Sequence, residues 1–357
     1  MDWIKQINEK LIDEESKRVF ASRVLYSLTG DETHLYNLGK EFRQSVLQSQ
    51  EWMNFIKMLH EHERKNGLVL YGAGAFGRKM IDMTDGVQWH LVIDKDPNSE
   101  ELLGIPLMRV SDYLAEGCQE SIVLPSKRHY EEMKNHLIDN GVSKDRIIDG
   151  TVLYDLTEGK QYFDLEFLPH VDGTEVFADV GSCDGMSSVQ FMKWCDGNGR
   201  CICFEPDEHN VELIRKNMDA KGIKETDNYL LIPKGAWDEE TRLSFVASGT
   251  ASAHITGLIG ENESSATEFV DVTTIDRVLD GENVTFIKMD IEGAELRALK
   301  GAEKTIGEKK PKLAICVYHK PEDIWEIPQF ILDIRDDYKF YLRHYSFEAA
   351  ETVLYAV

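Results

Sequence analysis

The feature that most constrains this fold is an alternation of short apolar segments with glycine-containing turns and helical patterns. It occurs twice. In the first half of the chain the apolar segments are residues 68–71, 90–93 and 121–124. In the second half they are residues 176–179, 201–205, 229–232, 286–290 and 313–317. Such alternation predicts mainly parallel sheets covered by helices. We therefore expect an α/β protein with a small and a larger Rossmann-like domain.

Residues 1–65 differ from the rest because they show no strong strand pattern. Trp3, Ile7 and Leu11 recur at helical spacing, and the helical pattern resumes after Gly30. A chain of 357 residues is too long for one typical domain. We predict a helical segment at 1–65, a small Rossmann-like domain at 66–150 and a larger domain at 151–357. The helical segment is expected to pack on a later domain or on a second subunit, which would give a homodimer.

Charge and apolar content exclude several kinds of partner. The 40 Lys and Arg residues against 64 Asp and Glu residues give a formal net charge of -24. Such a charge repels a phosphate backbone, so we expect no nucleic-acid partner. No segment approaches the roughly 18 apolar residues of a membrane-spanning helix, so no membrane insertion is expected. The six cysteines are scattered and unpaired in sequence, as in reduced cytoplasmic proteins.

A glycine loop follows the first strand of the larger domain. Its sequence is Asp179-Val180-Gly181-Ser182-Cys183-Asp184-Gly185, and a helical pattern follows. Glycines let a backbone approach a ligand closely because they carry no Cβ. The loop alone is equally compatible with a tight structural turn or with a dinucleotide. Glu205 ends the next strand twenty residues after Gly185, before Pro206, and a carboxylate there suits the hydroxyls of a ribose.

Further polar residues follow the later strands. Asp290 ends the strand at 286–290, with Glu292 just beyond it, and His319 follows the strand at 313–317. Glu295 is expected in the first turn of a helix, where a carboxylate complements the helix dipole. Because the carboxyl ends of parallel strands meet at one edge, these side chains are expected near the glycine loop.

With these segments in order, the chain resembles the FkbM family of S-adenosylmethionine (SAM)-dependent methyltransferases over about residues 165–357. The resembling stretches are 179–188, 204–206, 235–237, 272–276, 287–295 and the strand before His319. The loop departs from the family's usual form at Ser182-Cys183-Asp184, where small or Asn-like residues are common. The resemblance implies a class I methyltransferase domain with SAM as cofactor. It also implies O-methylation of a hydroxyl on a sugar, glycan or secondary metabolite, so the expected partner is a small-molecule or carbohydrate acceptor.

The resemblance also implies roles for individual residues. Those expected at the cofactor are Asp179, Gly181, Ser182, Asp184, Gly185, Glu205, Pro206, Gly235, Ala236, Trp237 and Asp290. Trp237 is expected beside the adenine, or else as an ordinary core aromatic, with Asp238 near the adenine amine. Residues 244–270 are polar, and we expect either an insertion that covers the substrate or a plain surface hairpin.

The catalytic prediction centres on His319, Asp290 and Glu292. Methyl transfer from a sulfonium is an in-line displacement, so the enzyme chiefly aligns the reacting atoms. An alcohol must also lose its proton, and an imidazole can take it near neutral pH. The alternative for His319 is a structural histidine. The three side chains could also hold a Mg²⁺-like ion, but the sequence does not favour a metal.

A second glycine loop lies in the smaller domain. Gly72-x-Gly74-x-x-Gly77 matches the dinucleotide fingerprint, and Asp94 ends the next strand. Two alternatives to the leading prediction follow from it. The chain could be an NAD-dependent oxidoreductase. Alternatively, the domain resembles small domains of sugar-modifying enzymes, which implies that it binds a nucleotide-sugar, tethers the substrate, or binds nothing and serves only in packing. A further alternative is a SAM-binding module that has lost its chemistry.

Overall fold

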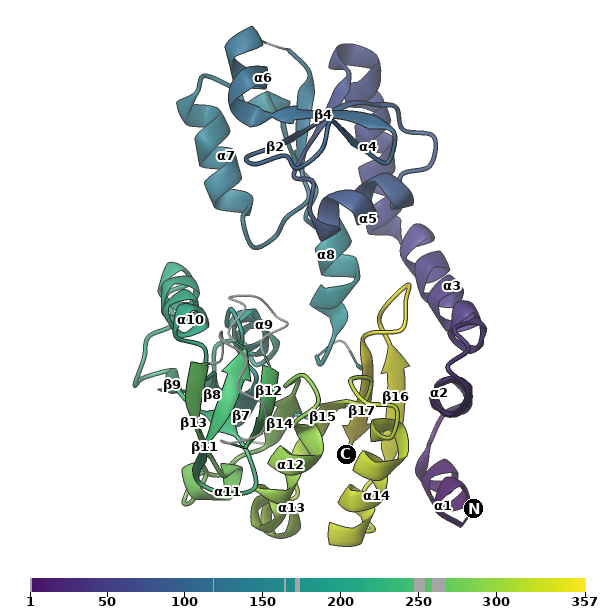
Figure 1. The fold of residues 1–357 in the computed structure, drawn as a ribbon, viewed down its shortest axis with the longest axis vertical. Coiled ribbons are helices and arrows are strands. Elements are labelled where there is room, and N and C mark those ends of the chain that lie inside the picture. The colour runs from purple at the N-terminus through teal and green to yellow at the C-terminus, as the bar shows by residue number, and fades with distance from the viewer. Residues whose placement is uncertain (1, 118, 164, 171–173, 247–253, 259–267) are drawn as a thin grey trace. The chain divides into compact units, whose positions relative to one another are not determined.

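The computed structural model describes residues 2–117, 119–163, 165–170, 174–246, 254–258 and 268–357. They form two compact units (Figure 1). Unit 1 combines Met1–Lys40 with Tyr162–Val357, and unit 2 is Glu41–Gln161. The predicted helical segment at 1–65 therefore contributes to both units. Because the polypeptide enters and leaves unit 2 between two parts of unit 1, unit 1 is discontinuous in sequence.

Unit 2 is built on a six-stranded sheet in the order β3-β4-β2-β1-β5-β6. All neighbours are parallel except β3 and β4. The strands are β1 (Leu68–Tyr71), β2 (Trp89–Asp94), β3 (Glu101–Leu102), β4 (Ile105–Arg109), β5 (Ser121–Leu124) and β6 (Ile147–Asp149). The helices are α4 (Gln50–Asn66), α5 (Ala75–Met83), α6 (Val110–Glu116), α7 (Tyr130–Asp139) and α8 (Val152–Leu156), with 3-10 turns at Lys144–Arg146 and Glu158–Lys160. The central strands β1 and β5 are buried throughout, as their apolar sequences predict.

Unit 1 contains a seven-stranded sheet in the order β16-β17-β15-β14-β7-β8-β9. Its strands are β7 (Glu175–Val180), β8 (Gly199–Phe204), β9 (Tyr229–Ile232), β14 (Phe286–Met289), β15 (Lys312–Cys316), β16 (Phe340–His344) and β17 (Thr352–Ala356). The five predicted strands are parallel to one another. Strand β17 is inserted between β15 and β16 and runs antiparallel to both.

Six described helices of unit 1 lie between these strands in the sequence. They are α9 (Met186–Trp194), α10 (Glu208–Ala220), α11 (Ile275–Val278), α12 (Glu295–Lys300), α13 (Glu303–Lys309) and α14 (Asp323–Ile334). Local sequence explains several helix starts: the Asp207 side chain accepts hydrogen bonds from two backbone N–H groups of α10, and Thr274 caps α11 in the same way. Among the described residues, no helix is both long and apolar enough to cross a membrane.

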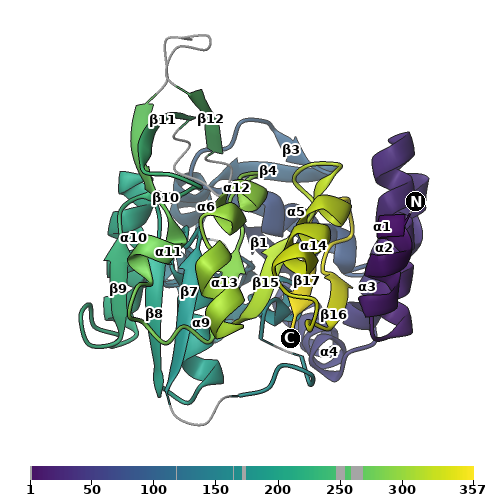
Figure 2. The same ribbon diagram turned by 90° about the horizontal axis from the view of Figure 1, so that it is seen from below.

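The N-terminal helices complete the core of unit 1. Helices α1 (Asp2–Lys10) and α2 (Glu14–Thr29) pack against α14 and β16 (Figure 2). Ile7 and Phe20 lie in the same apolar cluster as the strands of the large sheet, and Leu11 forms an isolated parallel bridge with Phe340. Helix α3 (Thr33–Leu47) runs from unit 1 into unit 2. Residues 1–40 thus pack on a later part of the same chain.

A smaller four-stranded sheet is formed by the residues between β9 and β14. Its order is β10-β13-β11-β12, formed by β10 (Gly235–Ala236), β11 (Thr241–Val246), β12 (His254–Leu258) and β13 (Glu268–Thr273). Strand β11 pairs antiparallel with both β12 and β13. The predicted insertion at 244–270 therefore contributes strands to this sheet, and its residues 247–253 and 259–267 lie outside the described part of the chain.

Candidate active site

The carboxyl ends of the central strands of unit 1 bring the predicted site residues to one edge. Asp179 is the last residue but one of β7, Glu205 directly follows β8, and Asp290 directly follows β14. His319 lies three residues beyond the end of β15. Because these four strands are parallel neighbours in the sheet, their ends share an edge. The glycine loop and the predicted catalytic residues therefore lie at the same edge of the sheet.

The glycine loop after β7 passes very close to the end of β14. Gly181 has φ +82°, and a Cβ at this position would lie 2.0 Å from the backbone oxygen of Asp290. Gly185 has φ +78° and would bring a Cβ to 3.3 Å from Ile214. Left-handed backbone and close approach both require glycine. Glycine is thus required at position 181 both by the left-handed turn and by the closeness of the Asp290 backbone.

Asp179 is buried and serves the loop and the helix that follows it. Its Oδ2 accepts hydrogen bonds from the hydroxyls of Ser187 and Ser188 at 2.6 and 2.7 Å. Its Oδ1 pairs with Lys288 Nζ at 3.4 Å, and this ammonium also donates to the Gly181 carbonyl at 2.7 Å. The predicted role of Asp179 at the cofactor is therefore accompanied by a role in holding β7, β14 and α9 together.

Lys288 was missed by the sequence reasoning. It is a single lysine inside the apolar strand β14, and burial of an unpaired ammonium is costly, so a partner carboxylate nearby could have been inferred. Burial lowers its pKa, but Asp179 and Asp290 outweigh that effect and raise the pKa above the ordinary value. Lys288 therefore stays charged.

The other polar residues of the loop stabilise its turn. The Ser182 hydroxyl donates to the Asp179 carbonyl at 2.7 Å. Asp184 Oδ1 accepts from the Met186 N–H at 3.1 Å, and its backbone oxygen accepts from Asn217 at 2.9 Å. Both side chains were predicted at the cofactor, and in the structure both have contacts within the loop.

Glu205 connects the loop to the start of α10. Its Oε2 accepts from the Cys183 N–H at 2.8 Å and its Oε1 from the Asp207 N–H at 3.0 Å, across the half-buried Pro206. Burial of the carboxyl raises its pKa to about 7, against the lowering effect of these hydrogen bonds. Oε1 also accepts from Asn210 at 3.5 Å. A carboxylate oxygen has two lone pairs, so Oε2 retains acceptor capacity for a ligand hydroxyl.

The segment that follows the carboxyl end of β9 contains further residues predicted at the cofactor. Gly235 and Ala236 are the buried residues of β10, and the Trp237 N–H donates to the Thr273 carbonyl of β13. Trp237 is half-buried, with the Arg297 guanidinium 5.5 Å from the centre of its ring. Arg297 also pairs with Asp238.

One oxygen of Asp238 is distinctive. Its Oδ1 is buried and accepts no hydrogen bond from any described residue, whereas Oδ2 pairs with Arg297. Buried acceptors are normally satisfied. An amino group such as that of adenine is the kind of donor that this oxygen lacks.

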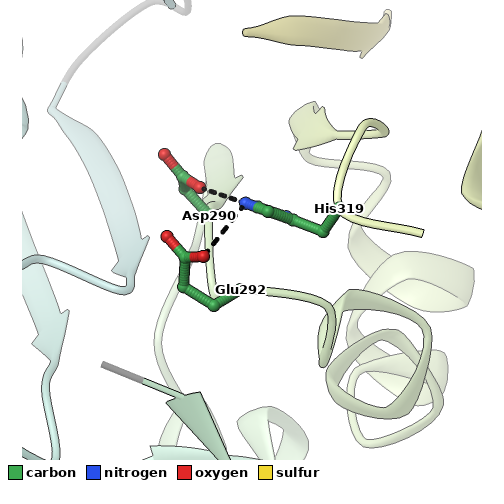
Figure 3. A group of neighbouring side chains, drawn as sticks. All are labelled: Asp290, Glu292 and His319. Atoms are coloured by element: carbon green, nitrogen blue, oxygen red, sulfur yellow. Dashed lines mark ion pairs between the residues drawn. The ribbon is translucent and has the colours of Figure 1, made fainter. Parts of the chain in front are cut away.

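The three predicted catalytic residues lie together (Figure 3). His319 Nε2 lies 3.5 Å from Asp290 Oδ1 and 3.8 Å from Glu292 Oε2. Glu292 takes the left-handed conformation, φ +55°, immediately before Gly293. Asp290 also accepts hydrogen bonds from Tyr162 at 3.2 Å and from Tyr318 at 3.5 Å.

A third carboxylate, Glu295, approaches the other ring nitrogen of His319. Its Oε1 lies 2.8 Å from His319 Nδ1 and also accepts the Ile291 N–H. Burial lowers the pKa of His319, but Glu295, Asp290 and Glu292 outweigh burial and raise that pKa to about 9. Glu295 does begin α12, as predicted, but its buried carboxylate also supports His319, which the helix-dipole argument did not foresee.

The glycine loop of unit 2 has the geometry of its fingerprint. Gly72 has φ +118°, and a Cβ at Gly77 would lie 2.0 Å from the Gly72 carbonyl oxygen. A Cβ at Gly74 would meet no atom within 4 Å. Asp94 Oδ2 accepts the Ala73 N–H at 2.7 Å. The first and third glycines are therefore required by the turn itself, and Asp94 supports it.

The fold and the site together define a class of protein. A sheet of six parallel strands and one antiparallel strand inserted next to the last, with a glycine loop after the first strand and a carboxylate after the second, is the Rossmann-like fold of class I methyltransferases. The family model for the methyltransferase FkbM domain matches residues 179–347, which include all these strand ends. The chain therefore contains a methyltransferase FkbM domain over these residues.

Several solved structures are similar to this chain. A methyltransferase FkbM from Methylobacillus flagellatus is 20% identical, covers 92% of this chain and 100% of its own, and has a TM-score of 0.48. Aeropyrum pernix fibrillarin with bound SAM is 11% identical over 55% of this chain and 71% of its own, with a TM-score of 0.34. A SAM-dependent methyltransferase from Aquifex aeolicus is 13% identical over 52% and 84%, with a TM-score of 0.31. The comparison with curated proteins finds no match.

Proposed function

We propose that the chain transfers a methyl group from SAM to a hydroxyl oxygen of a sugar, glycan or secondary metabolite. The observation that supports this most is the group formed by Asp290, Glu292 and His319 at the sheet edge that also carries the glycine loop. An alcohol is a weak nucleophile until its proton is removed, so acidic and basic groups beside the methyl donor favour a hydroxyl acceptor.

The chain's own residues fit SAM. The backbone from Gly181 to Gly185 would cradle the cofactor, and Glu205 would accept the ribose hydroxyls. The buried, unsatisfied Oδ1 of Asp238 suits the adenine amine. We place Gly235, Ala236, Trp237 and Pro206 around the adenosine, as the resemblance implies.

The chemistry assigned to the site is a balanced displacement. When bound, SAM supplies a methyl group on a sulfonium sulfur, a good leaving group. The acceptor oxygen forms a bond to the methyl carbon while the carbon–sulfur bond breaks, leaving its electron pair on sulfur. The hydroxyl proton passes to the Asp290, Glu292 and His319 group, with neutral His319 as the proposed acceptor. Because the pKa of His319 is raised to about 9, the neutral imidazole is the minor form at neutral pH in the unliganded protein.

The first test is a methyl-transfer screen with the full chain. We expect deuterated methyl from SAM to appear on an oxygen of a hydroxylated sugar, glycan or secondary metabolite, located by mass spectrometry and NMR. His319→Ala should slow turnover by about 100-fold or more, because acid–base catalysis typically contributes that much. Its affinity for S-adenosylhomocysteine, measured by calorimetry, should stay within about threefold of the unmodified chain if His319 acts on the acceptor.

Asp280→Asn is the matched control, since Asp280 lies on the exposed surface of unit 1 and pairs only loosely with Lys304, at 3.6 Å. It should change neither turnover nor binding. Transfer of the methyl group to nitrogen or carbon would refute O-methylation. Unchanged turnover in His319→Ala would refute the base assignment alone.

A second binding function, in unit 2, is supported by the loop at Gly72–Gly77, whose Gly74 leaves open space where a phosphate group approaches such turns. We infer that this loop binds a nucleotide or nucleotide-sugar. Calorimetry of the full chain with NAD, NADH and nucleotide-sugars tests it. Tight binding of NADH, with redox turnover, would instead favour the oxidoreductase alternative.

A further inference from the structure

Neither ring nitrogen of His319 makes a well-aligned hydrogen bond to a described residue, although Nδ1 lies 2.8 Å from Glu295 Oε1. The His319 side chain is only 9% exposed, and its Nε2 makes no hydrogen bond to any described residue. Figure 3 shows this nitrogen pointing between the carboxylates of Asp290 and Glu292. A buried polar nitrogen aimed into a polar site normally has a ligand.

The distances around Nε2 are those of ligands to a common ion. It lies 3.5 Å from Asp290 Oδ1 and 3.8 Å from Glu292 Oε2, and the three ligand atoms all lie within 4.8 Å of one another. A charge-assisted hydrogen bond would be about 2.7–2.9 Å long. Two ligand atoms about 2.1 Å from one ion, at roughly 90–110° to each other, are separated by roughly 3.0–3.4 Å. The two distances from Nε2 are within a few tenths of an ångström of that range, and the two carboxylate oxygens lie within 4.8 Å of each other.

The neighbour on the other side of the ring supports the same arrangement. Glu295 is fully buried, and its Oε1 lies 2.8 Å from His319 Nδ1. A carboxylate at one ring nitrogen fixes the imidazole orientation and directs the other nitrogen toward a metal. The Ile291 N–H, donated to the same oxygen, holds Glu295 in place.

We propose that Asp290, Glu292 and His319 bind one divalent transition-metal ion such as Mn²⁺, and that this ion contacts the acceptor hydroxyl. The second part rests on the proposed function. Three protein ligands leave coordination positions open, and the carboxyl side chains of Asp290 and Glu292 are 26% and 31% exposed, so an acceptor can reach them.

The ligand types select the ion. Two carboxylates favour hard divalent cations, whereas an imidazole nitrogen favours first-row transition metals over Mg²⁺ and Ca²⁺. A mixed set of one nitrogen and two oxygens therefore suits Mn²⁺ better than Mg²⁺. Bound there, the ion supplies positive charge that lowers the pKa of the acceptor hydroxyl. The hydroxyl proton then leaves to water at the exposed side of the carboxylates, and His319 acts as a ligand in place of the proposed base.

Direct binding of MnCl₂ tests the site without reference to turnover. The full chain, stripped with EDTA, is titrated while free Mn²⁺ is followed by electron paramagnetic resonance. We expect one equivalent to bind, with at least about tenfold weaker binding of MgCl₂ in a competing titration. Glu292→Gln and His319→Gln should each weaken Mn²⁺ binding by at least about tenfold, as loss of a ligand does.

Asp280→Asn again provides the control, because it removes one carboxylate from the same unit and should leave Mn²⁺ affinity unchanged. Thermal unfolding of each variant, metal-free, confirms that the fold is intact. Failure of the unmodified chain to bind Mn²⁺ at millimolar concentration overturns the inference. Equal binding by Glu292→Gln and His319→Gln overturns it as well.

Methyl transfer in the same samples separates this inference from the proposed function. Full turnover of a hydroxyl acceptor in EDTA, without Mn²⁺ binding, would overturn the ion site and leave O-methylation in place. Stoichiometric Mn²⁺ binding that the variants lose, with no hydroxyl acceptor methylated, would support the ion site and count against the proposed function. Turnover that EDTA removes and MnCl₂ restores would support both.

Discussion

Gly181 shows how one residue can be fixed by a neighbouring strand. Its φ of +82° is left-handed, and a Cβ would lie 2.0 Å from the Asp290 carbonyl oxygen. Gly181→Ala should therefore destabilise unit 1 by more than about 3 kcal/mol and abolish S-adenosylhomocysteine binding, because β7 and β14 must separate. Denaturant unfolding and calorimetry measure the two effects.

Gly197 offers a matched control for this prediction. Its φ of +78° is equally left-handed, but a Cβ there would meet no atom within 4 Å. Gly197→Ala should thus cost only the conformational strain, about 1 kcal/mol, and leave binding unchanged. Equal losses of stability in the two variants would show that the close approach to Asp290 is unimportant.

Glu205 makes the stability of the chain depend on pH in a predictable direction. Burial raises the pKa of its carboxyl to about 7, above the ordinary value of 4.5. Between these values the folded chain holds a proton that the unfolded chain releases, so the contribution of Glu205 is most favourable below pH 4.5 and is lost as the pH rises through 7. Relative to Glu205→Gln, the unmodified chain should lose about 2 kcal/mol of unfolding free energy between pH 5 and pH 8.

The comparison is made by urea unfolding at the two pH values. Asp280→Asn, at an exposed site, should parallel the unmodified chain. If Glu205→Gln shows the same decline with pH as the unmodified chain, Glu205 is not the group responsible.

How far sequence reasoning predicted the candidate site depended on the kind of residue. Asp290, Glu292 and His319 were foreseen because residues at the ends of parallel strands must meet at one edge. Glu295 was interpreted only through the helix dipole, because its contact with His319 depends on how the chain turns at Glu292 and Gly293. Such turns depend on tertiary packing, which spacing alone does not encode.

At the scale of elements, the opposite end of the sheet is held by a buried ion pair. Glu175, at the start of β7, pairs with Lys312, at the start of β15, at 2.9 and 3.0 Å, and both side chains are buried. Glu175→Gln should destabilise unit 1 by about 3 kcal/mol, since it leaves Lys312 buried without a counter-charge. Affinity for S-adenosylhomocysteine should not change, because the pair lies at the amino ends of the strands.

Glu225→Gln is the control for this experiment. Glu225 pairs with Arg215 at 3.3 Å, but both side chains are exposed, so the change should cost less than about 1 kcal/mol. Urea unfolding compares the variants. A loss in Glu175→Gln no larger than that in Glu225→Gln would contradict the prediction.

The predicted strands differ in how legible their sequences were. All five strands predicted for the larger domain were found, because each is a short apolar segment; the inner strands β7, β14 and β15 are buried throughout, and the edge strand β9 alternates buried and half-buried residues. Strands β16 and β17 were not predicted, and no periodicity in the sequence indicates that β17 inserts antiparallel beside β15. The short strand β10 was missed because its two residues are too few for any pattern to emerge.

At the scale of the whole molecule, the first forty residues complete unit 1 from the other end of the chain. The Asp13 side chain pairs with Arg343 at 2.7 Å, and Arg23 donates to the backbone at Ala349 and Ala350. Helical periodicity predicted helices in these residues but did not indicate which later segment they cover. Apolar stripes of similar spacing fit many surfaces, so the spacing alone does not identify the segment on which these helices pack.

The discontinuity of unit 1 sets an order of events during synthesis. Unit 2 is one continuous segment, residues 41–161, so all its helices and strands are available as soon as residue 161 has left the ribosome. The Asp13 side chain, by contrast, pairs with Arg343, 330 residues later, and the apolar faces of α1 and α2 stay uncovered until α14 and β16 have been made. Domains form as units once their parts are present. A nascent chain therefore carries a complete unit 2 between two incomplete parts of unit 1, and a product that ends before α14 lacks the elements on which α1 and α2 pack.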